Sequence, residues 1–246
     1  MISVCMATYN GEKYIKEQLD SILSQLESDD ELLISDDGST DNTISIIQSY
    51  NDSRIHILNH VPKPSYSGHE KVSSNFENAL KNAHGDYIFL SDQDDIWCKD
   101  KVKKCVEKLQ DNDFVYHNAE YFYDDGRQNM IRFASNPFPK NWFMNLKQMS
   151  LSGCCFAFNR KCLGLSLPFP EKLIGQDYWI SSIALKYCKL CYIDECLILH
   201  RRYNESVSTN KKNSLIFKFK YRLNLFIQLI FHFYSLKKCL LILKML

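Results

Sequence analysis

Several features that would place this chain outside the ordinary globular enzymes are missing from it. The sequence contains no internal repeat and no low-complexity tract. It begins with an apolar run at residues 2–7, without the basic segment, the longer apolar segment and the small-residue cleavage site of a secretory leader. We therefore expect these residues to form a strand and the protein to stay in the cytoplasm. No glycine-rich loop with Lys or Arg lies near the N-terminus, which counts against a nucleotidyltransferase.

Disulfide and zinc frameworks are not indicated either, although the chain has ten cysteines. Most of them lie inside apolar stretches, where a reduced cysteine behaves as a small hydrophobic residue. Cys188, Cys191 and Cys196 suggest a zinc site, but no second CxxC pair follows and the segment has the pattern of a buried strand. We expect neither disulfides nor bound zinc.

Charge divides the chain into two parts. A chain of 246 residues with 45% hydrophobic and 24% charged residues is ordinary for one globular domain. Residues 211–246 contain eight Lys or Arg and no Asp or Glu, so the rest of the chain has 22 basic against 29 acidic residues. We predict a globular domain over 1–210 and a basic amphipathic helical tail over 211–246.

The tail combines its basic residues with apolar and aromatic ones. Its uncharged stretch, 223–236, has 14 residues, fewer than the about 20 that a membrane-spanning helix requires. We expect the tail to lie in the membrane interface, where anionic lipids attract lysines, or to pack on the globular domain as an ordinary amphipathic helix. Nucleic-acid binding is not expected, because no RNA- or DNA-binding motif accompanies the tail.

Strand and helix patterns alternate through residue 120. Short apolar runs predict strands over 54–58, 87–90 and 113–117. Apolar residues recur at helical spacing over four segments, 14–26, 44–50, 72–83 and 102–109. This order predicts an α/β fold with a mostly parallel central sheet and flanking helices.

Two aspartate clusters follow apolar runs. Asp36 and Asp37 come after one run, and Asp92, Asp94 and Asp95 come after another. Ligands of open α/β sheets bind outside the carboxyl ends of the strands, so both clusters should face one crevice. The alternating carboxylates of Asp92 and Asp94 are typical of a site for Mg²⁺ or Mn²⁺. A calcium EF-hand is excluded, because neither cluster has the glycine and glutamate that its loop requires.

These motifs also resemble a known family, in order along the chain. The segments that carry the resemblance are MATYNGEKYIKEQLDSIL at 6–23, DDGSTDNT at 36–43, GDYIFLSDQDDIWCKDKV at 85–102, SGCCFAFNR at 152–160, GQDYW at 175–179 and LILHRRYN at 197–204. Together they are similar to family 2 glycosyltransferases with the GT-A nucleotide-diphospho-sugar transferase fold. The resemblance covers about residues 1–210 and is strongest to bacterial rhamnosyl- and glucosyltransferases of O-antigen and capsular polysaccharide synthesis.

The resemblance implies residues that bind the donor nucleotide. Thr8 and Tyr9 belong to this set, and the ring of Tyr9 should stack on the pyrimidine base. Asp37 should accept a hydrogen bond from N3–H of that base, and Asp36 should help to hold the nucleoside. Asp92 should lie near the ribose and the metal. The residues alone leave open a half-buried aromatic ring for Tyr9 and helix capping for the DDGSTD segment.

The expected metal ligands are Asp92, Asp94 and His200. Relatives carry Tyr-Arg-x-His near the end of the catalytic domain, whereas this chain has Tyr203 at the place of that histidine. His200 would then substitute from a neighbouring position, unless it is only structural. Arg201 and Arg202 are expected to contact the diphosphate, because guanidinium groups pair well with phosphate oxygens, and surface charge is the alternative.

The second half of the chain should contribute the acceptor site. The resemblance places the catalytic base at Asp177, which would take the proton of the acceptor hydroxyl; helix N-capping is the alternative role. Relatives often have His at the place of Gln176. Gly153 is expected to line the acceptor floor and Trp179 to stack on the acceptor sugar, unless both are core residues.

The resemblance thus implies an inverting, metal-dependent glycosyltransferase. It would use Mn²⁺ or Mg²⁺ and transfer a sugar from a UDP-hexose or dTDP-rhamnose donor. The acceptor would be an undecaprenyl-diphosphate-linked saccharide at the inner face of the bacterial plasma membrane, with the protein bound there peripherally. A nucleotide-sugar-binding protein without turnover is the alternative from another class.

Overall fold

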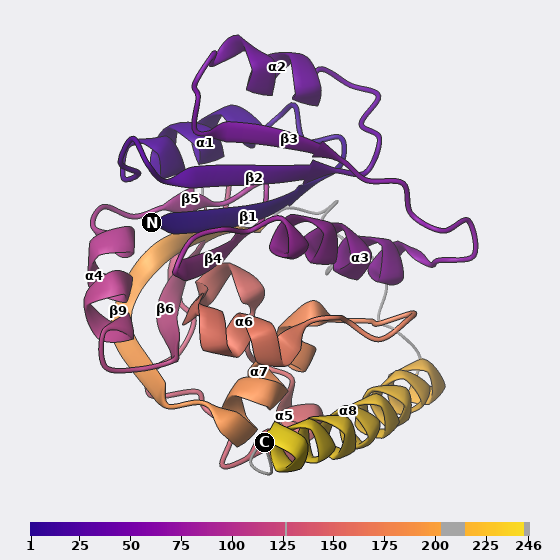
Figure 1. Cartoon of the computed structure of the whole chain (residues 1–246). Helices are drawn as coiled ribbons and strands as arrows, with labels where there is room; N and C mark the ends of the chain where they lie inside the picture. The colour runs from indigo at the N-terminus through magenta and orange to yellow at the C-terminus, as the bar shows by residue number, and fades with distance from the viewer. Residues whose placement is uncertain (126, 203–214, 244–246) are drawn as a thin grey trace.

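The computed structural model describes residues 1–125, 127–202 and 215–243 (Figure 1). Tyr203 and the predicted domain boundary at residue 210 lie outside this part of the chain. Within it, one mixed sheet contains the strands β1 (Ile2–Thr8), β2 (Glu31–Asp36), β3 (Ile55–Asn59), β4 (Tyr87–Ser91), β5 (Ile96–Trp97), β6 (Phe114–Phe122), β7 (Met130–Ile131), β8 (Phe156–Asn159) and β9 (Leu190–Arg201).

The helices are α1 (Ile15–Leu23), α2 (Thr43–Ser49), α3 (Gly68–Lys81), α4 (Lys101–Leu109), α5 (Trp142–Gln148), α6 (Arg160–Ser166), α7 (Gln176–Tyr187) and α8 (Leu215–Leu243), with a 3₁₀ turn η1 (Gly153–Cys155). The four helices predicted from periodicity are confirmed, with ends shifted by a few residues. The α/β class is confirmed as well.

The sheet is parallel in one half and mixed in the other. Its order is β3-β2-β1-β4-β8-β6-β9-β5, with β7 paired to β6. The pairs β3–β2, β2–β1 and β1–β4 are parallel, as crossover helices require. Strand β8 is antiparallel to both of its neighbours. The expectation of a mostly parallel sheet therefore holds from β3 to β4 and again for the pair β6–β9, which is parallel. It fails at β8 and at the short strands β5 and β7, which run antiparallel to their neighbours.

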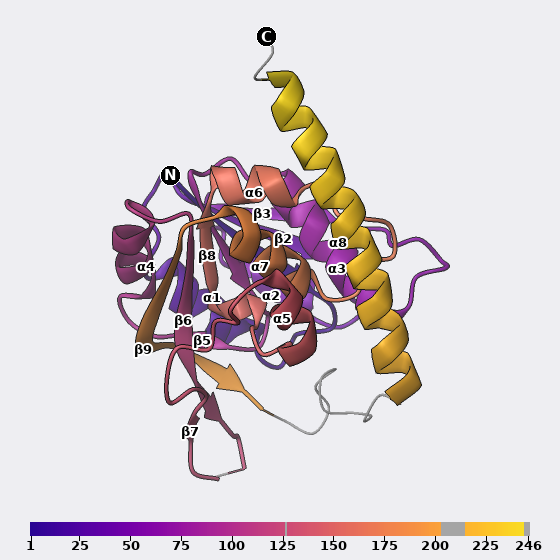
Figure 2. The same ribbon diagram turned by 90° about the horizontal axis from the view of Figure 1, so that it is seen from below.

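The core lies between the sheet and its helices. Strand β2 is buried along its whole length, because helices cover both of its faces. Helix α3 begins with a capping box, in which Ser67 and Glu70 satisfy each other's backbone amides. In Figure 1, α5, α6, α7 and α8 gather below β4, on the side away from α1 and α2; Figure 2 views the molecule from that side, with these four helices in front.

Helix α8 packs on the domain along one face. Leu225, Leu229 and Phe233 are buried there, and the Phe233 ring meets Trp142 of α5 with centroids 5.1 Å apart. The amide of Gln228 donates to the Glu171 carbonyl at 3.1 Å. Packing along this face agrees with one of the two expectations for the tail, an amphipathic helix that packs on the globular domain. In the described part of the chain, no helix has both the length and the apolarity needed to cross a membrane.

Candidate active site

The parallel strands bring the two aspartate clusters to one edge of the sheet. Thr8 is in register with Asp36, and Met6 with Ser91, so β1, β2 and β4 end side by side. The loops that follow these strands, beginning at Tyr9, Asp37 and Asp92, therefore leave from the same edge. Both clusters thus lie at one edge of the sheet, and the crevice expected between them stays a prediction.

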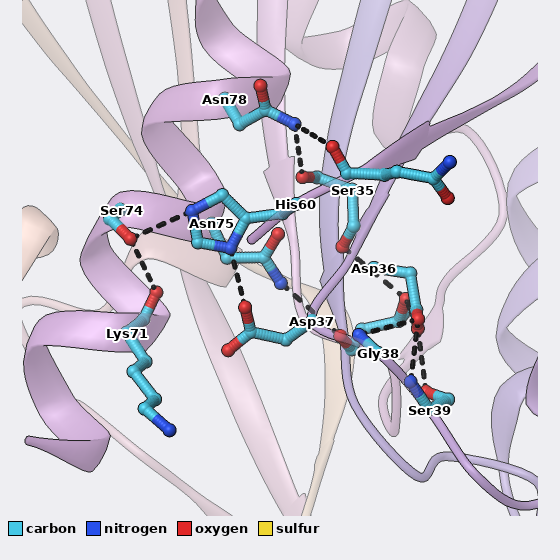
Figure 3. A network of polar contacts seen from close by, with 12 residues as sticks. Ser35, Asp36, Asp37, Gly38, Ser39, His60, Lys71, Ser74, Asn75 and Asn78 are labelled. Carbon is cyan, nitrogen blue, oxygen red and sulfur yellow. Dashed lines mark hydrogen bonds and ion pairs between the residues drawn. The ribbon is translucent and has the colours of Figure 1, made fainter. Parts of the chain in front are cut away.

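Asp36 holds the loop after β2. Its Oδ1 accepts from the backbone amides of Gly38 and Ser39 at 3.0 and 2.8 Å, and its Oδ2 accepts from the hydroxyls of Thr8 and Ser39 at 2.8 and 2.6 Å (Figure 3). Gly38 has a φ of 81°, which favours glycine in this turn. Because both carboxylate oxygens are bound within the protein, Asp36 and Thr8 fix the shape of the loop.

Asp37 lies next to Asp36 but has different partners. Its backbone amide donates to the Thr8 carbonyl at 3.0 Å, and its Oδ1 lies 2.5 Å from Nδ1 of His60. The other ring nitrogen of His60 lies 2.9 Å from the Ser74 hydroxyl, so the three side chains form a row from the loop after β2 to α3 (Figure 3). Nothing in the local sequence around His60 or Ser74 indicates this contact, since 14 residues separate them.

Tyr9 is exposed for 56% of its surface, so its ring is open to a ligand. Its backbone is fixed by Gln93, the residue between the two aspartates: Tyr9 N donates to Gln93 Oε1 at 2.9 Å, and Gln93 Nε2 donates to Tyr9 O at 3.1 Å. A Cβ on Gly11 would stand 2.5 Å from Gln93 Oε1, so a side chain there would displace the Gln93 amide from its present position. Gln93 thus joins the first loop to the aspartate loop.

Carboxylates converge in the aspartate loop. Burial, and then the charges of Asp94 and Asp177, raise the pKa of Asp92 to about 8. These negative charges repel one another, and a bound divalent cation would neutralise them. Carboxylate oxygens are also the ligands that Mg²⁺ and Mn²⁺ prefer. Asp92 and Asp94 therefore fit a metal of this kind.

His200 lies next to Cys154 and to Asp95, the third aspartate of the cluster that follows β4. Its Nδ1 is 3.6 Å from Sγ of Cys154, and ligand atoms of Asp95, Cys154 and His200 all lie within 4.8 Å of one another. Burial and the nearby Arg202 and Arg132 lower the pKa of His200 to about 3, so the ring is neutral. The structure thus groups His200 with Asp95 and Cys154.

Asp177 lies in the first turn of α7, and the helix is capped by Gly175 instead. The alternative role of Asp177 as N-cap is therefore wrong. Burial raises the pKa of Asp177 to about 6, against the lowering effects of the Gly153 amide and Arg132. A Cβ on Gly153 would stand 2.4 Å from Asp177 Oδ1, so the absence of a side chain at Gly153 lets the carboxylate approach η1.

Two further residues support the region around Asp177. The hydroxyl of Ser73, on α3, donates to Oε1 of Gln176 at 3.0 Å, which ties the start of α7 to α3. Arg132 donates to the Ser152 hydroxyl at 2.7 Å, close to η1, and is the cation that lowers the pKa of Asp177. Arg132 was missed in the sequence, because it lies in no recognisable motif.

The prediction for Trp179 is corrected by its burial. Its side chain is 1% exposed, its Nε1 donates to the Ser166 carbonyl at 2.8 Å, and its ring lies 4.8 Å from that of His232 on α8. A ring enclosed in this way offers no face to a sugar. Trp179 is a core residue that joins α6, α7 and α8.

Arg201 is also corrected. Its side chain is 4% exposed. The guanidinium donates to the carbonyl of Asp94 at 2.9 Å and forms ion pairs with Glu17 and Asp124, while its backbone amide donates to Asp95 at 3.0 Å. With its donors bound in this way, Arg201 holds the aspartate loop and is not available to a diphosphate. The half-buried Arg202 lies over the Tyr121 ring, 4.5 Å from its centroid, and keeps its expected role as a prediction.

Comparison with known proteins agrees with this geometry. The sequence model of Glycosyl transferase family 2 matches residues 3–164. The chain is 32% identical to dTDP-rhamnosyl transferase RfbG of Shigella flexneri, over 88% of this chain and 77% of that protein. It is 27% identical to the UDP-Glc:alpha-D-GlcNAc-diphosphoundecaprenol beta-1,3-glucosyltransferase WfgD of Escherichia coli, over 87% and 82% of the two chains.

Solved structures agree at the level of the fold. The mannosyltransferase PcManGT of Pyrobaculum calidifontis, in complex with GDP-Man and Mn²⁺, superposes with a TM-score of 0.58 at 19% identity. The match covers 96% of this chain but only 64% of that one, so this chain spans less than two thirds of its length. The match to the family model and the similarity to RfbG show that this chain belongs to glycosyltransferase family 2.

Proposed function

We propose that this protein is an inverting glycosyltransferase that transfers a sugar from a nucleotide-diphosphate donor to a lipid-diphosphate-linked saccharide. The observation that supports the proposal is the position of Asp177: its carboxylate lies next to Gly153 in η1, and η1 packs on β4, the strand that leads into Asp92 and Asp94. One carboxyl group, with a pKa of about 6, thereby lies beside a pair suited to a metal-bound diphosphate. A base and a leaving-group site next to each other are what glycosyl transfer requires.

The donor would lie across the loops after β1, β2 and β4. The exposed Tyr9 ring offers a stacking surface for the base, and Asp37 offers a carboxylate oxygen to its N3–H. Asp36 and Thr8 act indirectly, by fixing the loop that carries Asp37. A Mn²⁺ or Mg²⁺ ion held by Asp92 and Asp94 would stabilise the charge of the leaving diphosphate.

Asp177 would act on the acceptor. Its carboxylate takes the proton of an acceptor hydroxyl while that oxygen bonds to the anomeric carbon and the bond to the diphosphate breaks. Attack from the face opposite the leaving group inverts the configuration of the anomeric carbon. A pKa of about 6 leaves most of Asp177 ionised near neutral pH and more basic than an ordinary aspartate. Gly153 serves this step by leaving room for the carboxylate.

The relatives support one donor class and one acceptor class for this proposal. The names of RfbG and WfgD specify dTDP-rhamnose and UDP-glucose chemistry, and that of WfgD specifies a diphosphoundecaprenol acceptor. We infer the same classes for this chain, with an undecaprenyl-diphosphate-linked saccharide as the acceptor in surface polysaccharide synthesis. Such an acceptor is anchored in the membrane, so the enzyme would work at the inner face of the plasma membrane.

The outer face of α8 supports a position at that surface. Large apolar side chains are exposed there, among them Phe231 at 70% and Tyr234 at 72%. Exposed lysines, including Lys218 and Lys237, lie on the same helix. An exposed apolar face combined with lysines is typical of helices that bind anionic membrane surfaces.

The test is a transfer reaction with purified protein, Mn²⁺, a synthetic N-acetylglucosamine-diphosphate-lipid and a mixture of UDP- and dTDP-sugars. Mass spectrometry of the acceptor should show a gain of one hexose or one deoxyhexose. Binding of a UDP-sugar without product on a panel of acceptors would favour a nucleotide-sugar-binding protein without turnover. The absence of both binding and product would contradict the proposal.

A further inference from the structure

The contact between His60 and Asp37 has a consequence for which nucleobase the site accepts. We propose that His60 is a positioning residue that restricts Asp37 to one available oxygen, and so selects uracil or thymine over guanine. This inference rests on the proposed function, in which Asp37 faces the base of the donor. It extends that function by assigning specificity to a residue outside the motifs of the sequence.

The geometry of the contact leaves one oxygen of Asp37 for a ligand. The Nδ1 atom of His60 lies 2.5 Å from Oδ1 of Asp37 (Figure 3). A carboxylate can only accept hydrogen bonds, so Nδ1 carries the hydrogen and donates it. Among the described residues, no donor is found on Oδ2 of Asp37.

The row of side chains behind Asp37 makes this arrangement rigid. The side chains of His60 and Asp37 are 11% and 10% exposed, so water competes little for their contact. The Ser74 hydroxyl lies 2.9 Å from Nε2 of His60 and thereby fixes the orientation of the ring. The backbone amide of Asp37 is bound to the Thr8 carbonyl, so the carboxylate cannot simply turn away with its main chain.

Nucleobases differ in how many donors they present to such a carboxylate. Uracil and thymine present a single N3–H between two carbonyl oxygens, so one free carboxylate oxygen suffices and a second would face a carbonyl. Guanine presents N1–H and an amino N–H side by side, which a carboxylate binds best with both oxygens. Because His60 occupies Oδ1, guanine would leave one polar donor unpaired, and an unpaired buried donor is costly.

The preference can be measured as the ratio of two affinities. The dissociation constants of UDP and GDP are determined by isothermal titration calorimetry for the full chain in the presence of Mn²⁺. In His60→Leu the donor is lost and both oxygens of Asp37 become available. We expect the wild-type protein to bind UDP more tightly than GDP. In His60→Leu, the preference for UDP, measured as the dissociation constant of GDP divided by that of UDP, should fall about tenfold, because guanine gains one charge-assisted hydrogen bond to the oxygen that His60 occupied.

His60→Asn is the matched control, because its side-chain amide can donate from nearly the place of Nδ1. This variant should keep the UDP preference, whereas a merely structural effect of replacing His60 would reduce both affinities in both variants and leave the ratio unchanged. If His60→Leu does not fold, Ser74→Ala tests the same row; freeing the His60 ring should lower the ratio in the same direction.

Two results would overturn the inference. An unchanged UDP-to-GDP ratio in folded His60→Leu or in Ser74→Ala would show that His60 does not set the preference, and equal affinity of the wild-type protein for UDP and GDP would show that there is none. Both results leave the proposed glycosyl transfer intact. Failure of the wild-type protein to bind any nucleotide would instead remove the proposed function, and the inference with it.

Discussion

The substitution Gly153→Ala should lower kcat while leaving the fold in place. The added Cβ would stand 2.4 Å from Oδ1 of Asp177 and 3.2 Å from Cδ1 of Leu90. Since Cβ atoms essentially never come closer than 3.0 Å to such atoms, the carboxylate must retreat from 2.4 to at least 3.0 Å. The Asp177 side chain can do so by rotating, so stability should change little. A displacement approaching 1 Å at a reacting group costs up to about 10²-fold in rate.

The assay is kcat for sugar transfer, with the melting temperature measured in parallel. Gly164→Ala is the matched control, because it makes the same change on the exposed side of α6 with no atom within 4 Å of the new Cβ. We expect kcat to fall between about tenfold and about 10²-fold in Gly153→Ala and to stay unchanged in Gly164→Ala. Full activity of a folded Gly153→Ala protein would refute the placement of Asp177 at the reaction centre.

Three further predictions follow from other contacts. The kcat should fall as the pH drops below about 6, because burial raises the pKa of Asp177 to that value and a protonated carboxyl cannot accept a proton; a pH–rate profile that is flat down to pH about 5 would contradict this. Arg201→Met should lower the free energy of unfolding in urea by about 2 kcal/mol, because the buried guanidinium loses its ion pairs with Glu17 and Asp124. The loss is moderate because both carboxylates are partly exposed and can be solvated. An unchanged unfolding midpoint would contradict the role of Arg201 in holding the aspartate loop. Phe231→Ser should reduce the fraction of protein that sediments with anionic vesicles but leave the melting temperature unchanged, because this ring is exposed. An equal sedimenting fraction would show that this face of α8 does not bind the membrane.

The order of elements and the position of the aspartates could be predicted from the sequence. Strands β1, β2 and β4 are apolar runs that end in polar loops. Because parallel strands have their carboxyl ends at the same edge of the sheet, these loops must meet there. The antiparallel insertion of β8 could not be predicted, because a four-residue strand has no pattern that reveals its direction.

Individual side chains were harder to place than elements. Arg201 has the residue type of a phosphate ligand, but its ion-pair partners Glu17 and Asp124 are distant in sequence, and only the fold shows that they occupy it. Trp179 lies two residues after the predicted base, yet helical geometry turns its ring into the core. His60 was missed for the opposite reason: it lies in a proline-containing loop region without a motif, and only its contact with Asp37 gives it a role.

The most direct test of the central claim is the behaviour of Asp177→Asn. The change removes the proton acceptor but keeps the size of the side chain, so kcat for transfer from the donor to the lipid-linked acceptor should fall by about 10²- to 10⁴-fold. The dissociation constant of UDP in the presence of Mn²⁺ should stay within about twofold, because Asp37, Asp92 and Asp94 are unchanged. Wild-type kcat in a folded Asp177→Asn protein would contradict the account.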